Sequence, residues 1–317
     1  MTKSKENDQG RYFEYLVSKK IQNKYKVSLT KRAQKDQSRD CRKKVASKKI
    51  RSMELASEKI CNWLSENLDL DEDSTLDRLP DREFDKQTHE DISIVDKNNK
   101  TLSFSLKHNH DAIFHGRVGS VAKSNWLKID KEKNKKIINT FEVNKNKLIT
   151  NLQKTIPVGT VFAGAFFEGT KRKGIKKEYW QVWKDFVKDL HDEVINFLLD
   201  GTTNNEGAVK NLFDTITGGG KDQYRVLKKG NSNRIIIQTI KDLKIPGKVK
   251  IKNIQIPNDK SPFNFYVWHL VLEFDNGMII DGRLKQDKII MLRTGPVIKS
   301  DWKVTCWGES GMHEQII

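Results

Sequence analysis

A predicted β-hairpin constrains the fold of this chain more than any other feature of its sequence. Two short runs, DISIVD and TLSFSLK, are separated only by the polar residues KNNK, near residues 91–107. Alternating apolar and polar residues interrupted by a turn-forming stretch are typical of two antiparallel strands. Side chains two positions apart in a strand lie on the same face, so Ser105 and Lys107 share a polar face. The residues that alternate with them are apolar, and we therefore expect a half-buried hairpin.

The length of the hairpin loop decides whether Asp91 can lie beside Lys107. Directly opposed residues of an antiparallel pair share a face. A two-residue Asn-Asn turn would place Asp91 opposite Leu106, whereas a three- or five-residue loop would place it opposite Ser105 or Lys107. A site shared by Asp91 and Lys107 therefore requires the longer loop. The alternative is a solvated hairpin whose polar face has no chemical role.

A carboxylate and a lysine that flank one pocket suit the chemistry of a phosphodiester. Asp91 would give an oxygen ligand to a divalent cation, and Lys107 would polarise water or balance charge. On this hypothesis both residues are catalytic, and Asp91 is also a metal ligand.

Two runs of the sequence resemble a known family. SLKHNHDAIFHGR, with an aspartate on the preceding strand, resembles the active-site segment of HaeIII-type restriction endonucleases, and NDQGRYFEY resembles the opening of that group. The resemblance implies a type II restriction endonuclease of the PD-(D/E)xK class, with an α/β core of mixed sheet and flanking helices. It also implies Mg²⁺-dependent cleavage of double-stranded DNA at a short site, GGCC, and a cognate DNA methyltransferase in the host.

The chain departs from the wider class at one position. The residue two before the lysine is usually Glu or Asp, and here it is Ser105, whose hydroxyl is a poor metal ligand beside a carboxylate. The backbone carbonyl of Leu106 is a candidate metal ligand. Glu14 is the candidate second carboxylate, for catalysis and for the metal, because helical spacing places it at the edge of an apolar stripe beside Ile21. The alternative for Glu14 is an ion pair with Arg11 on its own helix.

Charge and composition narrow the class of partner. The 317 residues include 59 basic and 42 acidic ones, a net charge of +17, which is typical of proteins that act on a polyanion and is also found in lysine-rich proteins without such a partner. Basic residues crowd positions 19–51 and 123–147, where they could contact phosphates, and aromatic residues in the second run could stack on bases. Three widely spaced cysteines, no apolar run of membrane-spanning length and no signal-peptide core lead us to expect a cytoplasmic protein that binds no membrane.

We expect an α/β protein in two parts. Residues 1–220 form a helical and catalytic region, and residues 221–317 form a β-rich region with a possible role in DNA recognition. In the second part, DNG between VLEF and MIID is a strong hairpin signal. Helical spacing predicts one helix that begins at residue 10. It predicts three more helices over residues 38–68, 177–199 and 206–216.

Contacts to DNA are expected from polar residues that follow the hairpin and from basic residues on or beside the later strands. Histidines and amides would hydrogen-bond around the scissile phosphate, and Arg or Lys is the usual reader of guanine in the major groove. The candidates are His108, Asn109, His110, Arg117, Arg234, Arg283, Lys285 and Arg293. The histidine run lacks the partner cysteines typical of a zinc site.

Two other functions fit the same features. A nucleic-acid-binding protein without catalysis would share the basic charge, and its hairpin would be merely structural. A DNA-repair or RNA-processing nuclease would share the site and would cut according to the structure of its substrate instead of its sequence. Both a monomer and a homodimer are compatible with the sequence.

Overall fold

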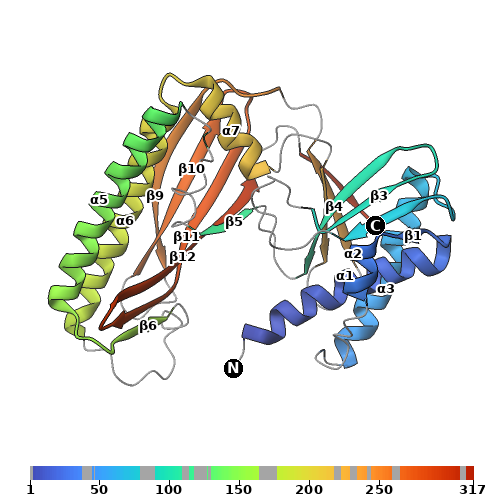
Figure 1. Cartoon of the computed structure of the whole chain (residues 1–317), viewed down its shortest axis with the longest axis horizontal. Helices are drawn as coiled ribbons and strands as arrows, with labels where there is room; N and C mark the ends of the chain where they lie inside the picture. The colour runs from blue at the N-terminus through green and yellow to red at the C-terminus, as the bar shows by residue number, and fades with distance from the viewer. Residues whose placement is uncertain are drawn as a thin grey trace. The chain divides into compact units, whose positions relative to one another are not determined.

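The structure is a computed structural model of mixed α/β class, and it falls into two compact units (Figure 1). The first unit is built from 1–111, 218–243 and 311–317, and the second from 112–217 and 244–310. The units therefore do not follow a single division of the chain near residue 220. The residues described are 3–37, 45, 47–78, 90–108, 114–117, 127, 130–163, 177–217, 223–228, 234–240, 244–258, 265–307 and 312–317.

The first unit contains a mixed sheet, which in the described part of the chain has seven strands. Their order across the sheet is β1-β2-β3-β4-β7-β8-β13. The β1–β2 and β4–β7 pairs are parallel and the other pairs are antiparallel. The strands are β1 (Ser28–Leu29), β2 (Thr75–Arg78), β3 (Ile92–Val95), β4 (Thr101–His108), β7 (Gln223–Lys228), β8 (Ile235–Ile240) and β13 (Met312–Ile316). Three strands from the last third of the sequence thus complete the sheet that holds the predicted hairpin.

Helices α1 (Lys3–Tyr25), α2 (Lys31–Gln37) and α3 (Ser47–Asn67) belong to the same unit. The structure confirms a helix over the predicted stripe, although α1 begins before residue 10. Its apolar side chains, among them Phe13 and Ile21, are buried in one core with Phe104 of β4. Burying each such side chain stabilises the fold by about 1.5–3 kcal/mol, so this core fixes which face of the hairpin is covered. The predicted helix over 38–68 is observed from residue 47, and 38–44 lie outside the described residues.

The second unit contains another sheet, whose described strands run in the order β5-β12-β11-β10-β9, with β6 paired to β11. The predicted DNG hairpin is confirmed, because Gly277 adopts a φ of 87° and the Phe274 N–H donates to the Met278 carbonyl at 2.9 Å. A positive φ is the conformation that glycine allows without a steric cost. The strands are β5 (Phe114–Arg117), β6 (Val161–Ala163), β9 (Val249–Asn258), β10 (Phe265–Phe274), β11 (Ile279–Leu292) and β12 (Gly295–Trp307).

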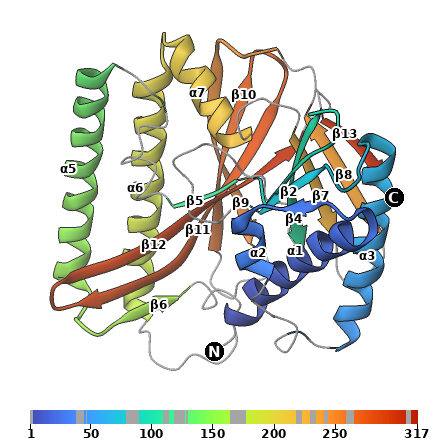
Figure 2. The same ribbon diagram turned by 45° about the vertical axis from the view of Figure 1, so that its right-hand side comes forward.

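Three helices accompany this second sheet: α5 (Lys131–Thr155), α6 (Lys177–Thr202) and α7 (Glu206–Thr217). The last two confirm the helices predicted at 177–199 and 206–216. Helices α5 and α6 run side by side, as Figures 1 and 2 both show, and the ring of Phe141 lies 5.7 Å from that of Phe197 between them. The second unit thus has a long helical pair packed beside its sheet.

Candidate functional site

The register of the β3–β4 hairpin places Asp91 beside Ser105. Ile92 lies opposite Phe104, and the same register extended by one residue pairs Asp91 with Ser105. The Asp91 N–H donates to the Phe104 carbonyl at 3.0 Å, which holds this end of the hairpin together. The expectation that the loop is longer than two residues is therefore confirmed, with the register that a three-residue loop gives.

The residues of the β3–β4 loop explain its length. The Asp96 N–H donates to the Lys100 carbonyl at 3.0 Å, so three residues lie between the two paired positions. Asn99 has a φ of 62°, a left-handed conformation that asparagine tolerates better than most residues. The Asp96 side chain accepts hydrogen bonds from the N–H groups of Asn98 and Lys100, at 2.9 and 2.8 Å. An Asp-x-Asn-Asn-Lys turn is thereby fixed at a length that sets the register of the site.

Three neighbours converge on one oxygen of Asp91. The Ser105 hydroxyl donates to Oδ2 at 2.9 Å, the Leu106 N–H donates to it at 2.6 Å, and the Lys107 Nζ lies 3.9 Å away. Among the described residues every contact of this carboxylate goes to Oδ2. Its other oxygen, Oδ1, is therefore the atom that could bind a cation.

The Asp91–Lys107 pair is sheltered but open. Their side chains are 18% and 17% exposed, which distinguishes this face from a fully solvated hairpin surface. A separation of 3.9 Å is too long for a hydrogen bond and is a distance at which a water can lie between two charged groups. The ammonium of Lys107 can therefore donate to a water or a phosphate without losing a short bond to Asp91.

Glu14 is placed in an ion pair that sequence spacing did not predict. Arg78, the last residue of β2, donates to the Glu14 Oε2 at 2.7 Å, and the two side chains are 9% and 18% exposed. Arg78 lies opposite Ile92, the neighbour of Asp91, and shares the face that packs against α1. Glu14 thus approaches the same end of β2 and β3 from the helix side of the sheet. A partner 64 residues away in the sequence gives no local signal.

Arg225 on β7 is a candidate that the sequence did not single out. It lies directly opposite Ser105 in the parallel β4–β7 pair, and only 7% of it is exposed. Opposed residues share a face, so its guanidinium belongs to the side of the sheet that carries Asp91 and Lys107. The pairing of β4 with a strand more than a hundred residues later is what brings Arg225 here, and local periodicity does not report such a contact.

The carboxyl ends of the parallel strands β4 and β7 bring His108 beside Lys228. The His108 ring lies 6.1 Å from the ring of Phe13 on α1, between centroids. Lys228 is 1% exposed, and burial, with the nearby charge of Lys49, lowers the pKa of its ammonium. The predicted DNA contact His108 therefore lies on the α1 side of the sheet, whereas Lys107 lies on the other.

The remaining predicted DNA contacts are divided between the two units. Arg234 is exposed just before β8 in the first unit, and Arg293 is exposed at the turn between β11 and β12 in the second. Arg117 lies on β5, while Arg283 and Lys285 lie on β11. Asn109 and His110 lie outside the described residues. The structure thus gathers Asp91, Leu106 and Lys107 into one site and leaves most of the basic candidates on other elements.

The second unit contains an acid–base pair of a different kind. On β10 and β11 the His269 Nδ1 lies 2.7 and 2.9 Å from the two carboxylate oxygens of Asp281, whose side chain is 6% exposed. His191 on α6 is 1% exposed, and burial lowers its pKa to about 4, against an opposing effect of Asp192 and with a smaller contribution from His269. Both oxygens of Asp281 are engaged, so this pair is closed.

The donors of the Asp91 site fit a magnesium ion that relies on its substrate for ligands. In the described residues no cluster of three or more His, Cys, Asp or Glu side chains is placed to hold a metal. Mg²⁺ commonly keeps several waters and is held through one or two carboxylates together with substrate phosphates. The Oδ1 of Asp91 suits that role. Leu106 contacts Asp91 through its N–H, and metal binding by its carbonyl stays a prediction.

Comparisons of the chain with protein-family models, curated proteins and solved structures found no match. In the part of the chain that the structure describes, none of the helices has the length and apolar character needed to cross a membrane.

Proposed function

We propose that the protein is a Mg²⁺-dependent endonuclease that hydrolyses double-stranded DNA at the Asp91–Lys107 site. The observation that supports this most is the convergence of Lys107, Ser105 and the Leu106 N–H on one oxygen of Asp91, with the other oxygen available. The net charge of +17 favours a polyanionic substrate. A mixed sheet with α1 packed on one face is compatible with a restriction-endonuclease-like core.

Each residue has a distinct part in the proposed reaction. Ser105 and Leu106 hold the Asp91 carboxylate so that Oδ1 keeps a fixed direction, which lowers the cost of ordering a ligand. Lys107 orients the attacking water and balances the charge that develops on the phosphate. Magnesium, when bound, would activate that water and neutralise the phosphate oxygens. Glu14 stays the proposed second carboxylate; its ion pair with Arg78 orients it on the α1 side of the sheet, so it would reach a metal at Asp91 around the end of β2 and β3.

The resemblance to HaeIII-type enzymes makes GGCC the proposed recognition site and a cognate methyltransferase the proposed companion in the host. Restriction of this type protects a cell only if its own sites are modified. The DNA-binding candidates, from His108 to Arg293, remain proposals for reading that site.

Digestion of a plasmid with purified protein tests the proposal. Discrete fragments in the presence of Mg²⁺, and none after EDTA, are expected, and addition of Mg²⁺ should restore cutting. Sequencing of the fragment ends would identify the site. Retarded but intact DNA would instead support a binding protein without catalysis, and cutting at branched or single-stranded structures would support a repair or RNA-processing nuclease.

A further inference from the structure

The second unit carries an unusually basic helix, α5. It has seven lysines and two glutamates. Of the two carboxylates, that of Glu142 accepts a hydrogen bond from the Lys145 ammonium at 2.5 Å. Its neighbour α6 has three lysines and six acidic residues. Six lysines of α5 are exposed: Lys131, Lys133, Lys135, Lys136, Lys147 and Lys154. Two adjacent helices of one unit thus have opposite charge.

Some of the lysines of α5 lie where helix physics disfavours them, although Lys154 lies in the last turn, where a cation is favoured. Lys131 and Lys133 fall in the first turn, where the partial positive charge of the helix N-terminus repels cations. Lys131 and Lys135 also form a like-charge pair four residues apart, which weakens a helix. On α6, by contrast, Lys188 pairs with Asp192 at 2.8 Å, the favourable arrangement. A face that breaks these local preferences is expected where function, and not stability, selects the residues.

Packing against α6 on the inner face of α5 accounts for most of its apolar residues. Phe141 is 3% exposed and packs on Phe197, while the Asn144 amide donates to the Glu193 carboxylate of α6 at 2.9 Å. Phe141 is therefore not available to stack on bases, which removes one of the possibilities raised by the aromatic residues of this run. The outward face is left with lysines, small polar groups, Glu132 and Val143, which is 52% exposed.

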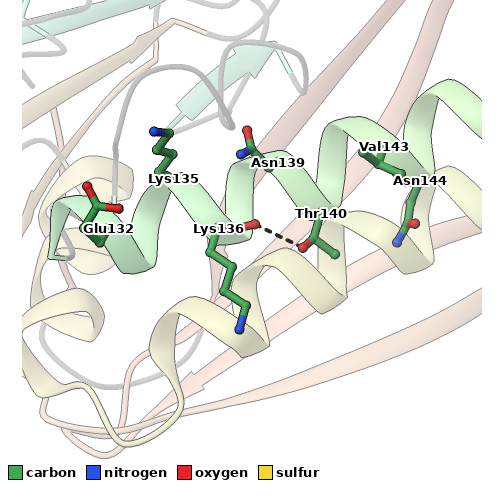
Figure 3. A pocket seen from close by; sticks show the side chains of 7 residues that line it. All are labelled: Glu132, Lys135, Lys136, Asn139, Thr140, Val143 and Asn144. Atoms are coloured by element: carbon green, nitrogen blue, oxygen red, sulfur yellow. Dashed lines mark hydrogen bonds between the residues drawn. The ribbon is translucent and has the colours of Figure 1, made fainter.

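Two hollows follow one another along the outward part of α5. The first is lined by Lys136 and Asn139, among others, and the second by Lys147 and Lys154. Both are shallow, and they adjoin at Val143, which lines both. Figure 3 shows the first of them, with the lysine and asparagine side chains extending from the ribbon. Ammonium and amide groups are the donors that proteins use on phosphate oxygens.

We propose that this outward face of α5 binds the sugar-phosphate backbone of double-stranded DNA. The proposal rests on the proposed function, since it takes DNA as the substrate. A helix of 25 residues is about 37 Å long, close to the length of one turn of a DNA duplex. Spacings of 11 and 7 residues separate Lys136, Lys147 and Lys154. Since 11 and 7 residues are close to whole numbers of helical turns, the three lysines lie on one side of the helix. Such a row neutralises phosphates without reading bases.

The test compares two variants that lose the same charge. One carries Lys136→Gln, Lys147→Gln and Lys154→Gln on α5. The control carries Lys97→Gln, Lys188→Gln and Lys210→Gln, three exposed lysines that pair with acidic residues. Binding to a fluorescent duplex is measured by anisotropy with EDTA present, over a series of salt concentrations, so that no cleavage enters the measurement.

The α5 variant should bind about tenfold more weakly at low salt. The dependence of its log K on log salt should be shallower by about 2–3, because each phosphate that the protein no longer neutralises lowers the slope by about 0.9. A further variant with the same three lysines changed to Arg should bind like the wild type.

Two results would overturn the inference: equal weakening in the α5 variant and the control, or loss of binding in the Arg variant. A wild type that binds through α5 but cuts no plasmid would refute the proposed function alone. A wild type that cuts while the α5 variant binds normally would refute the role of α5 alone.

Discussion

Each unit of the molecule sets a carboxylate beside a base on neighbouring strands, and the two pairs differ in how they are closed. In the second unit His269 reaches both oxygens of Asp281, at 2.7 and 2.9 Å, within a nearly buried pair. In the first, Lys107 stays 3.9 Å from Asp91, and one carboxylate oxygen is left available. A carboxylate with both oxygens engaged inside the protein offers less to a ligand than one with an oxygen left available. We therefore infer that the His269–Asp281 pair stabilises the fold and that the Asp91–Lys107 pair takes part in the proposed reaction.

The largest expected effect is on catalysis by the open pair. Asp91→Ala and Lys107→Ala should each reduce DNA cleavage about 100- to 1,000-fold or more, because each removes a preorganised charge at the reacting phosphate. DNA binding should be largely intact, since phosphate contacts elsewhere provide most of the affinity. Plasmid digestion rates and anisotropy measure the two quantities. Cutting retained by either purified variant would refute the assignment.

Mutation of the closed pair, His269 and Asp281, should lower stability and leave cleavage unchanged. Asp281→Ala leaves a largely buried histidine without its acceptor, so the free energy of unfolding should fall by about 1–3 kcal/mol. Thermal denaturation measures that loss, and cleavage by the protein that remains folded should match the wild type. The control is Glu58→Ala, which breaks the exposed pair with Lys20 and should cost about 0.5 kcal/mol or less. An Asp281→Ala protein of normal stability that no longer cuts DNA would reverse the two assignments.

Glu14 tests whether the open site has a second carboxylate. Glu14→Gln keeps the shape of the side chain and removes its charge, so cleavage should fall about tenfold and more Mg²⁺ should be needed for half-maximal rate. Arg78→Met, which removes the other member of the ion pair, should mainly lower stability. A Glu14→Gln protein with the wild-type Mg²⁺ dependence would confine Glu14 to a structural role.

The smallest expected effect is a pH dependence in the second unit. Burial lowers the pKa of His191 to about 4 from its ordinary value of 6.5, so the unfolded chain takes up a proton at higher pH than the folded chain does. Because of His191, the free energy of unfolding is therefore highest above about pH 6.5 and decreases as the pH falls toward 4. About 1 kcal/mol is lost by pH 5.5. His191→Leu should flatten this part of the stability profile in denaturant titrations. An unchanged profile would mean that other groups cause the acid sensitivity.

Local patterns predicted the elements of the site well. The alternation of β3 and β4 indicated which residues face the core, and the spacing of α1 indicated that Phe13 and Ile21 are buried. The register followed once the loop was known, because the side-chain period of a strand is two residues. The sequence alone left the loop length open, and the structure supplied it through the bonds of Asp96.

Contacts between distant parts of the chain were beyond local patterns. The pairing of β4 with β7, which brings Arg225 beside Ser105, joins segments separated by more than a hundred residues. The ion pair of Glu14 with Arg78 is equally nonlocal, and sequence spacing offered only Arg11 as a partner. A division of the chain at residue 220 also missed that β7, β8 and β13 complete the first sheet. Periodicity reports which face of an element is buried, but it does not report which element covers that face.

The most direct test of the central claim is to locate the metal. Crystals of the Lys107→Ala protein with duplex DNA and Mn²⁺ in place of Mg²⁺ would reveal the ion by its anomalous scattering. A peak about 2.1 Å from the Oδ1 of Asp91, and beside a phosphate of the DNA, is the result that we predict. An ion bound elsewhere, with no metal at the Oδ1 of Asp91, would contradict the account.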